Sequence, residues 1–349
     1  MFEELIRAWD GEEVVIRYDP PTSTWMFVGV HSTVLGPGMG GTRMKVYAVP
    51  ADGLRDVLRL SGAMTLKNAA AGLPYGGGKA VLAVPGVPLG DERRRLILRY
   101  ADLVASIGGS YVTACDMNTT EVDMDLIGER CPHVLGRSRD AGGSGSSGPA
   151  TAVGVFHGIR ASVAHAFGSN DLSGRTVVVQ GTGAVGARLA EMLAEAGASV
   201  VVSDVENERA LEVADRVGAE IAAPDVAPET PCDVLSPCAV GATMNGETIP
   251  RLRCRIVAGA ANNQLATPKD ADRLRYAGIL YAPDFVINAG GVLSLAGRET
   301  LGWSEERLQE SLRAIGDTLA EVFREADTVG VSTDEAAQRL ARARIDAAS

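Results

Sequence analysis

The sequence predicts an α/β protein of two domains, the second built on a doubly wound parallel sheet and followed by a helical C-terminal segment. A length of 349 residues suggests about two domains. From residue 175 onward, short apolar segments of strand length alternate with longer segments of helical periodicity. This alternation is typical of parallel βαβ units. The hydrophobic share of 46% is sufficient to bury a core in each domain.

The first predicted domain spans residues 1–138 and mixes strands with helices. Short segments rich in β-branched and aromatic residues predict strands at 13–18, 24–32, 79–84 and 111–114. Helical spacing of apolar residues predicts helices at 51–71, at 91–107 and from 119 onward. Thr119 or Thr120 would cap the last of these helices.

The second predicted domain spans residues 139–319 and is expected to contain the parallel sheet. Apolar segments predict its strands at 175–180, 199–203, 233–236, 255–258 and 279–281, with helices at 151–167 and 184–196. The Gly/Ser-rich segment Arg139–Pro149 is either a flexible linker or a loop at the domain boundary near a ligand. Residues from Ser304 onward are expected to be amphipathic helices, of which about 320–349 would pack on the first domain.

The pattern G-x-G-x-x-G occurs at 36–41, 143–148 and 181–186, and context separates the three matches. Only the third follows an apolar strand, opens a predicted helix and precedes an acidic residue, Asp204, at the end of the next strand. These are the requirements of a Rossmann-type dinucleotide site, with the phosphates at the helix N-terminus. The Asp204 carboxylate would bind the ribose hydroxyls and repel a 2′-phosphate, which predicts NAD rather than NADP.

Two lysines, Lys67 and Lys79, lie in the segment 64–80, which carries no other charge. They suggest a small site in which one ammonium holds a carboxylate, while burial and repulsion lower the pKa of the other. The alternative is a pair of lysines whose ammonium groups reach solvent around a glycine turn. The segment does not match a P-loop, because Leu73 and Ala80 replace the glycine and the Ser or Thr that a P-loop requires, which argues against that class.

Composition excludes several classes of function. The net charge of −11 argues against nucleic-acid and acidic-membrane binding, both of which need a basic surface. The acidic N-terminus does not resemble a signal peptide, no apolar segment is long enough to span a membrane, and a cytoplasmic location is expected. The five cysteines lack C-x-x-C spacing and the four histidines lack H-E-x-x-H spacing, so no disulfide framework or metal site is predicted.

Seven motifs, which follow one another along nearly the whole chain, carry a family resemblance. They occupy residues 35–43, 64–67, 76–79, 116–119, 181–186, 258–263 and 288–291. Together they resemble the glutamate/leucine/phenylalanine/valine dehydrogenase family. Four further segments resemble its actinobacterial phenylalanine dehydrogenase branch, at 141–147, 230–234, 278–285 and 297–304. The resemblance implies a homo-oligomer that converts an L-amino acid, water and NAD to a 2-oxo acid, ammonium and NADH.

The resemblance also implies roles for individual residues. Lys67 would hold the substrate carboxylate, Lys79 would be the general base, and Asp116 would be its partner in proton transfer. The implied substrate-binding residues are Lys67, Gly40, Met39, Ala114, Asn262, Val292 and Leu295. The implied cofactor-binding residues are Thr151, Gly181, Thr182, Gly183, Ala184, Val185, Gly186, Asp204, Cys238, Ala239, Ala260, Asn262 and Asn288.

Four pocket positions bear on the choice of amino acid. Met39 and Leu295 are apolar where glutamate-specific members carry a lysine and a serine, so a distal carboxylate would be buried unpaired, which disfavours glutamate. Ala114 departs from the glycine of phenylalanine-specific members, and Val292 resembles the leucine and valine enzymes. Similarity over the whole chain favours phenylalanine, whereas the pocket favours leucine or valine, with tryptophan as a further alternative. A non-catalytic NAD-binding sensor is the remaining alternative.

Overall fold

A computed structural model describes residues 2–348, which form two compact units. Unit 1 comprises the described residues up to 146, residues 295–302 and the described residues from 341 onward. Unit 2 comprises residues 147–294 and 303–340. These boundaries differ from the expected ones in three places. Residues 139–146 and 295–302 belong to unit 1 instead of the second domain, and residues 320–340 belong to unit 2 instead of the first domain.

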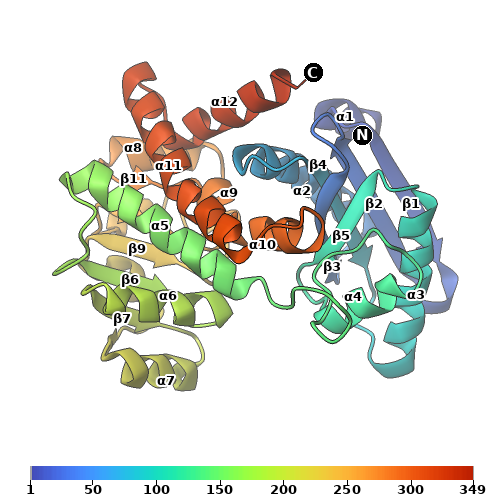
Figure 1. Ribbon diagram of the computed structural model, residues 1–349, viewed down its shortest axis with the longest axis horizontal. Coiled ribbons are helices and arrows are strands. Elements are labelled where there is room, and N and C mark those ends of the chain that lie inside the picture. Colours follow the sequence, from blue (N-terminus) through green and yellow to red (C-terminus); the bar gives the residue numbers. More distant parts are fainter. Residues whose placement is uncertain (1, 349) are drawn as a thin grey trace. The chain divides into compact units, whose positions relative to one another are not determined.

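Unit 1 is built on a mixed five-stranded sheet with the order β1-β2-β4-β3-β5 (Figure 1). Its strands are β1 (Glu13–Asp19), β2 (Thr24–Ser32), β3 (Gly38–Lys45), β4 (Gly76–Ala83) and β5 (Tyr111–Cys115). Its helices are α1 (Phe2–Trp9), α2 (Pro50–Ala70), α3 (Gly90–Ser106) and α4 (Glu121–Gly128). Strand β2 pairs antiparallel with β1 and β4, whereas β3 runs parallel to β4 and β5.

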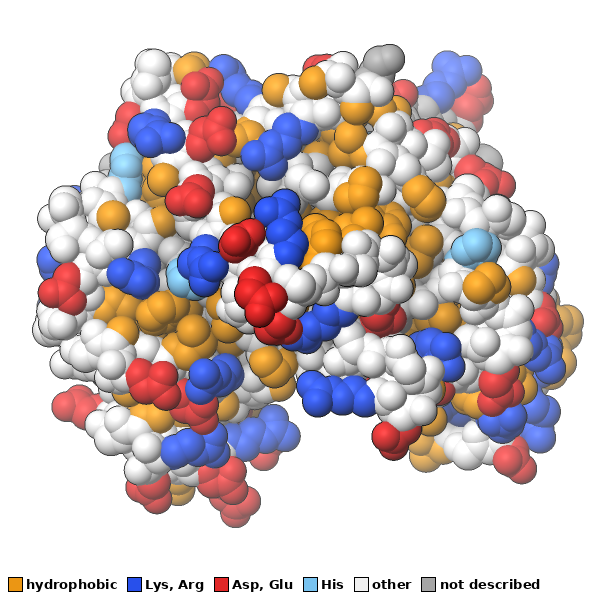
Figure 2. Space-filling model, viewed as in Figure 1, with side chains coloured by type: hydrophobic (Ala, Val, Ile, Leu, Met, Phe, Trp, Pro, Cys, Tyr) orange, Lys and Arg blue, Asp and Glu red, His pale blue; other side chains and the backbone are white. Residues whose placement is uncertain are grey.

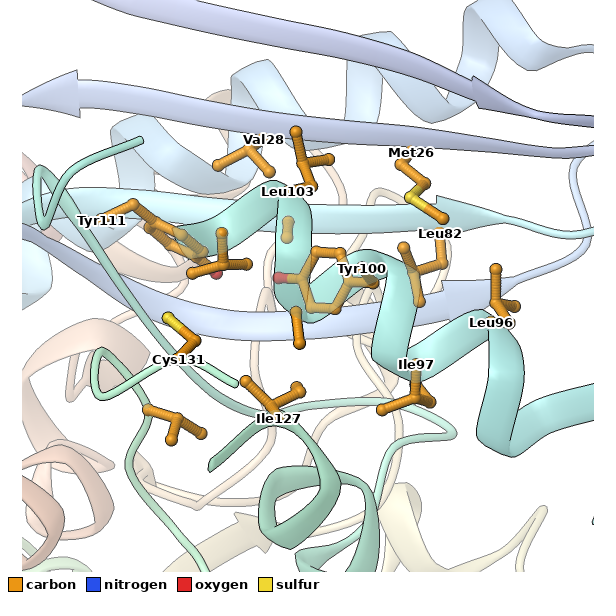
Figure 3. Close-up of a cluster of buried hydrophobic side chains, with 14 of the residues drawn as sticks. Met26, Val28, Leu82, Leu96, Ile97, Tyr100, Leu103, Tyr111, Ile127 and Cys131 are labelled. Carbon is orange, nitrogen blue, oxygen red and sulfur yellow. The ribbon is translucent and has the colours of Figure 1, made fainter. Parts of the chain in front are cut away.

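The two faces of the unit 1 sheet are covered by different helices, as the alternation of side chains along β4 shows. Val81 and Ala83 pack with Leu54 and Val57 of α2. Side chains of β4 that point to the other face, such as Leu82, pack in a hydrophobic cluster with residues of α3, among them Tyr100 (Figure 3). The period of two is that of a strand buried on both faces.

The glycine segments of unit 1 are strands, which the sequence did not predict. β4 begins at Gly76 instead of residue 79, and β3 covers residues for which the sequence predicted no strand. Glycine carries no strand preference and no apolar side chain, so it leaves no strand signal in the sequence. The glycines are nevertheless required, because a Cβ on Gly77 would lie 2.0 Å from Oγ1 of Thr65 in α2.

Unit 2 contains a six-stranded parallel sheet with the order β11-β10-β9-β6-β7-β8. Its strands are β6 (Thr176–Gln180), β7 (Ser199–Ser203), β8 (Glu220–Ile221), β9 (Val234–Pro237), β10 (Ile256–Val257) and β11 (Leu280–Tyr281). The helices after α4 in the chain are α5 (Gly148–Phe167), α6 (Ala184–Glu195), α7 (Asn207–Val217), α8 (Lys269–Tyr276), α9 (Asp284–Ile287), α10 (Gly290–Glu299), α11 (Glu305–Val329) and α12 (Thr333–Asp346). The order reverses direction between β6 and β9, which confirms the predicted doubly wound sheet.

Residues 139–146 of the Gly/Ser-rich segment form a hydrogen-bonded loop of unit 1, and residues 148–149 begin α5 in unit 2. The amide of Gly143 donates to the carbonyl of Ser138 at 2.9 Å, and the amide of Ser144 donates to Oε1 of Glu299 at 2.9 Å. The carboxylate of Glu299 also accepts from the amide of Gly136 at 3.1 Å. Within residues 2–348, no helix is long and apolar enough to cross a membrane.

Candidate active site

Lys79 lies in the middle of β4, on the face of the sheet that α2 covers. Its partner across the sheet is Gly29 of β2, where an added Cβ would lie 3.2 Å from Oγ of Ser61 in α2. Residues two positions away on the same strand face the same side, and Val81 packs against α2. Only 6% of Lys79 is exposed, so its ammonium lies in a site that excludes most water.

Asp116 directly follows β5 and is held by a turn that is tied to β3. The amide of Asp116 donates to Oγ1 of Thr119 at 2.9 Å, and that hydroxyl donates to the carbonyl of Thr42 at 2.8 Å. Asn118 adopts the left-handed conformation, with φ of 58°, and its Nδ2 donates to the carbonyl of Met44 at 3.0 Å. Asn tolerates this conformation better than most residues, so the turn fixes the carboxylate beside β3.

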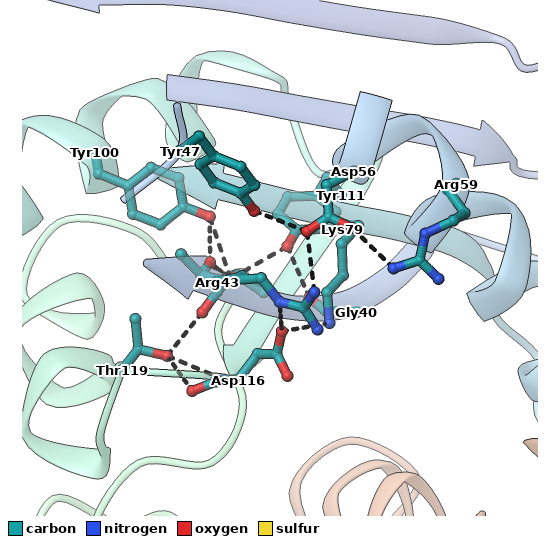
Figure 4. A network of polar contacts seen from close by, with 12 residues as sticks. Gly40, Arg43, Tyr47, Asp56, Arg59, Lys79, Tyr100, Tyr111, Asp116 and Thr119 are labelled. Atoms are coloured by element: carbon teal, nitrogen blue, oxygen red, sulfur yellow. Dashed lines mark hydrogen bonds and ion pairs between the residues drawn. The ribbon is translucent and has the colours of Figure 1, made fainter. Parts of the chain in front are cut away.

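The structure brings Lys79 and Asp116 together and adds Arg43 to the pair (Figure 4). Oδ2 of Asp116 lies 3.1 Å from Nζ of Lys79 and 2.9 Å from Nε of Arg43. The other side of the Arg43 guanidinium donates to Oδ2 of Asp56 at 2.9 Å. Asp56 also accepts from the hydroxyl of Tyr47 at 2.7 Å and from Arg59 at 2.8 Å. The six side chains therefore form a continuous network, in which all but Tyr47 are charged.

Burial and the neighbouring charges set the pKa values in this network. Burial lowers the pKa of Lys79, and Arg43 lowers it further, while Asp116 opposes the shift. Burial would raise the pKa of Asp116, but Lys79 and Arg43 outweigh it and lower that pKa to about 2. Asp116 is therefore ionised at neutral pH, and Lys79 loses its proton more easily than an exposed lysine does.

Lys67 lies in the last turn of α2 and is half-buried. The next residue, Asn68, donates from Nδ2 to the carbonyl of Gly76 at 2.6 Å and to that of Met39 at 3.2 Å. These bonds join the end of α2 to the first residues of β4 and β3. The backbone next to Lys67 is thus attached to the same two strands that position Lys79 and Arg43.

Three of the four predicted pocket residues belong to unit 1. Met39 on β3 and Ala114 on β5 are buried, at 2% and 6% exposure. Leu295 lies near the end of β5, because a Cβ on Gly136 would be 3.6 Å from Cδ2 of Leu295 and 3.9 Å from Sγ of Cys115. Val292, three residues earlier on α10, belongs to unit 2. All three unit 1 positions carry apolar side chains.

The predicted cofactor loop lies at the carboxyl ends of β6 and β9, where the strand order reverses. Gly181 has φ of +104°, and a Cβ there would lie 2.7 Å from Cβ of Ala239. A Cβ on Gly186 would lie 1.8 Å from the carbonyl oxygen of Gly181, so only glycine permits this tight turn. The amide of Cys238 donates to the carbonyl of Gln180 at 2.7 Å, which holds the segment after β9 beside the loop.

The start of α6 fits the phosphates of a dinucleotide. Gly183 is its N-cap residue and supplies no side-chain cap, and a Cβ on Gly183 would meet no atom within 4 Å. The first amides of the helix, those of Ala184, Val185 and Gly186, have no partner within the helix and are suited to bind an anion. At the end of β7, Asp204 accepts from the amide and the hydroxyl of Thr182, at 2.7 and 3.0 Å.

The remaining predicted cofactor residues lie in unit 2, where two asparagines are joined by a hydrogen bond. Nδ2 of Asn288 donates to Oδ1 of Asn262 at 2.9 Å and to the carbonyl of Ala260 at 3.0 Å. Thr151 lies close to the start of α10, since a Cβ on Gly291 would be 2.9 Å from its Oγ1. The residues of unit 2 thus fit NAD at the carboxyl edge of the sheet, as expected for a doubly wound fold.

Arg43, Asp56 and Tyr47 are the residues that sequence reasoning missed. Arg43 ends the glycine-rich motif 35–43, and its position there was a usable signal. A side chain with only 12% exposure that carries a permanent charge requires a partner. Its partner Asp116 is distant in the sequence, and its partner Asp56 lies on another element. Neither ion pair could therefore be predicted from the sequence.

Comparison with known families covers almost the entire chain. A family model described as "Glu/Leu/Phe/Val dehydrogenase, dimerisation domain" matches residues 24–133. A second, described as "Glutamate/Leucine/Phenylalanine/Valine dehydrogenase", matches residues 142–207 and 205–349.

Individual relatives agree with these matches. The chain is 40% identical over 343 residues to leucine dehydrogenase from Thermoactinomyces intermedius, which is 98% of this chain and 93% of that protein. It is 41% identical over 338 residues to valine dehydrogenase from Streptomyces albus, or 96% and 92% of the two chains. The crystal structure of L-tryptophan dehydrogenase from Nostoc punctiforme superposes with a TM-score of 0.83 at 37% identity, covering 100% of this chain and 99% of that one.

Proposed function

Because the chain belongs to the glutamate/leucine/phenylalanine/valine dehydrogenase family of NAD-dependent enzymes, we propose that it oxidatively deaminates a branched-chain aliphatic L-amino acid. The observation that carries this choice is the similarity to leucine and valine dehydrogenases at 40% and 41% identity over nearly the whole chain. The sequence resemblance placed phenylalanine first, and these relatives favour the alternative instead. The apolar side chains at Met39, Ala114 and Leu295 are compatible with an aliphatic substrate.

The proposed roles in unit 1 follow from charge and burial. Lys67 binds the substrate α-carboxylate as a fixed cation. The backbone of Gly40, next to Met39 on β3, is proposed as a further substrate contact; its lack of a side chain makes room for the carbonyl of Gly78 on β4. Lys79 in its neutral form takes a proton from the α-ammonium and later from the attacking water. Asp116, which lies 3.1 Å from Lys79, exchanges that proton with it and orients the amine.

NAD supplies the hydride acceptor for the hydrogen at the substrate Cα. We assign its pyrophosphate to the loop formed by Gly181, Thr182, Gly183, Ala184, Val185 and Gly186. Asp204 receives the adenosine ribose hydroxyls. The remaining contacts are assigned to Thr151, Cys238, Ala239, Ala260, Asn262 and Asn288, with Asn262 also orienting the substrate.

The net reaction balances without further reactants. The Cα–H bond breaks as its electron pair leaves with the hydride, and the nitrogen loses a proton to form an imine. Water adds to that imine, and the C–N bond breaks to release ammonium and the 2-oxo acid. For each substrate molecule, one NAD is reduced to NADH and one proton is released to solvent.

We also propose that the chain assembles as a homo-oligomer through unit 1, since the family model for residues 24–133 is described as a dimerisation domain.

A substrate panel tests the proposal. The purified protein is mixed with NAD and each of L-leucine, L-valine, L-phenylalanine, L-tryptophan and L-glutamate, and NADH is followed by its absorbance. We expect the highest kcat/KM with leucine or valine. A preference for phenylalanine or tryptophan would overturn the substrate class alone. Absence of turnover with every amino acid would overturn the enzymatic function.

A further inference from the structure

We propose that Arg43 is a positioning residue of the reaction, which neutralises Asp116 so that Lys79 is able to give up its proton inside a buried site. The inference rests on the proposed role of Lys79 as the base. It assigns a role to a residue that contacts the base only through a shared carboxylate.

The geometry shows that two cations share one carboxylate oxygen. Nζ of Lys79 lies 3.1 Å and Nε of Arg43 lies 2.9 Å from the same Oδ2 of Asp116. The side chains of Lys79, Asp116 and Arg43 are 8%, 21% and 12% exposed. Since solvent screens little of this charge, the carboxylate that would otherwise hold Lys79 in its protonated form is already paired.

The charge around Lys79 depends on Arg43. Asp116 and Asp56 carry two negative charges, and Arg43 offsets part of them through an ion pair with each carboxylate. Without Arg43, Asp116 would lose the ion pair at 2.9 Å and keep the one with Lys79 at 3.1 Å, which would hold the lysine in its protonated form. An arginine does not lose its proton in a protein, so Lys79 is the cation that does.

The surroundings of Lys79 contribute few other titratable groups. Within residues 2–348, the charged groups that act most strongly on its pKa are Asp116 after β5, Arg43 from β3 and Asp56 from α2. On β2 its direct neighbour is Gly29, and the nearby His31 directs Nδ1 to Oγ1 of Thr65 at 2.8 Å. Tyr47 and Arg59 reach the network through Asp56 (Figure 4), and Lys67 lies on the same helix as Asp56.

The site requires the shape of arginine as well as its charge. Nε of Arg43 donates to Asp116, while its terminal nitrogen donates to Asp56. A planar guanidinium presents these donors in fixed directions, whereas the single ammonium of a lysine sits at one point. We therefore expect Arg43→Lys to keep the positive charge but to neutralise Asp116 less completely.

Two independent measurements follow the protonation of Lys79. In the first, the substrate-free protein is labelled competitively with acetic anhydride, and the peptide that contains Lys79 is quantified by mass spectrometry. This gives the pH midpoint at which the amine of Lys79 becomes reactive. The acid limb of the pH profile of kcat/KM gives the midpoint during turnover. Arg43→Gln is expected to raise both midpoints by about one pH unit, since an unpaired neighbouring anion shifts a pKa by roughly 1–3 units. Arg43→Lys is expected to raise them by less.

A double-variant cycle separates action through Asp116 from simple repulsion. In an Asp116→Asn background, the labelling shift caused by Arg43→Gln is expected to fall to half or less. An equal shift in both backgrounds, or no shift in either, would overturn the proposal. The matched control is Arg55→Gln, which removes the same charge from α2 at a side chain that is 45% exposed and paired with Asp52; it is expected to leave both midpoints unchanged.

The readouts also separate this inference from the proposed function. If Arg43→Gln does not fold, as judged by thermal unfolding, the shift of Arg43→Lys with and without Asp116→Asn provides the same test. If the wild-type protein turns over no amino acid, the proposed function fails, yet labelling of Lys79 still reports on Arg43. If turnover is normal and the labelling midpoint does not respond to Arg43, only the present inference fails.

Discussion

Nζ of Lys79 lies 3.1 Å from Oδ2 of Asp116, although one residue is in the middle of β4 and the other follows the end of β5. The pair is largely buried, and each member shifts the pKa of the other toward its charged form. Burial and Arg43 act against that tendency at the lysine. The balance between these effects determines how readily Lys79 acts as a base.

Removal of the proposed base should stop turnover without affecting the cofactor site. Lys79→Ala is expected to lower kcat by roughly 10²-fold or more, as expected when a general base is lost. Because Lys79 lies in unit 1 and the glycine loop in unit 2, the affinity for NADH, measured by fluorescence titration, should change little. Loss of NADH binding would show that the two sites are not separate.

The stability contributed by Asp116 should depend on pH. Its pKa is lowered from 3.8 to about 2 in the folded state, so the ionised form stabilises the protein above pH 4, and this contribution disappears as the pH falls toward 2. The shift corresponds to about 2 kcal/mol. Asp116→Asn should therefore be less stable than the wild type at pH 7, and the difference should shrink between pH 5 and pH 2.5. Urea unfolding at several pH values measures this, and a difference that is constant with pH would refute it.

Two glycines of the cofactor loop should respond differently to alanine. A Cβ on Gly186 would lie 1.8 Å from a backbone oxygen, so Gly186→Ala should destabilise unit 2 by about 1–3 kcal/mol. A Cβ on Gly183 would meet no atom within 4 Å, so Gly183→Ala should fold normally.

If the pyrophosphate lies over Gly183, its alanine variant should nevertheless weaken NADH binding at least tenfold. Thermal unfolding and NADH titration of both variants distinguish the two effects. Unchanged NADH affinity of Gly183→Ala would remove the loop from the proposed phosphate site.

The carboxylate of Asp204 should select against a 2′-phosphate. Asp204→Asn keeps the size of the side chain and an oxygen that accepts the Thr182 hydrogen bonds, but it removes the negative charge. We expect the ratio of kcat/KM for NAD to that for NADP to fall about tenfold, equivalent to ~1.4 kcal/mol. If this ratio does not change, Asp204 is not responsible for the choice of cofactor.

Glu299 should hold the Gly/Ser-rich loop in place. Its carboxylate accepts hydrogen bonds from the amides of Gly136 and Ser144 and from the hydroxyl of Ser144. Glu299→Gln should cost about 1–3 kcal/mol, because the ionised acceptor is lost, and should make residues 136–145 easier to cleave with a protease. The exposed Glu247→Gln is the control, and equal protease sensitivity of the two variants would contradict the prediction.

Much of unit 2 was predictable from the sequence, because its signals are local. An apolar strand, a glycine turn and a helix lie next to one another in the chain, so the loop at Gly181–Gly186 and the acidic residue at Asp204 were recognisable directly. The family resemblance was also confirmed. Unit 1 was harder, since β3 consists largely of glycine at its start and gives no apolar alternation.

The kinds of chemical group at the site are readable from the amino-acid order alone: two lysines in an uncharged segment, a dinucleotide loop and an aspartate that follows a strand. Which of the charged groups meet depends on the fold. Arg43 and Asp116 are 73 positions apart, and they pair because β3 and β5 are neighbours in the sheet. Glu299 reaches Ser144 across 155 positions. The strength of a charge pair depends on distance and burial, and for residues so far apart in the chain the fold alone determines both.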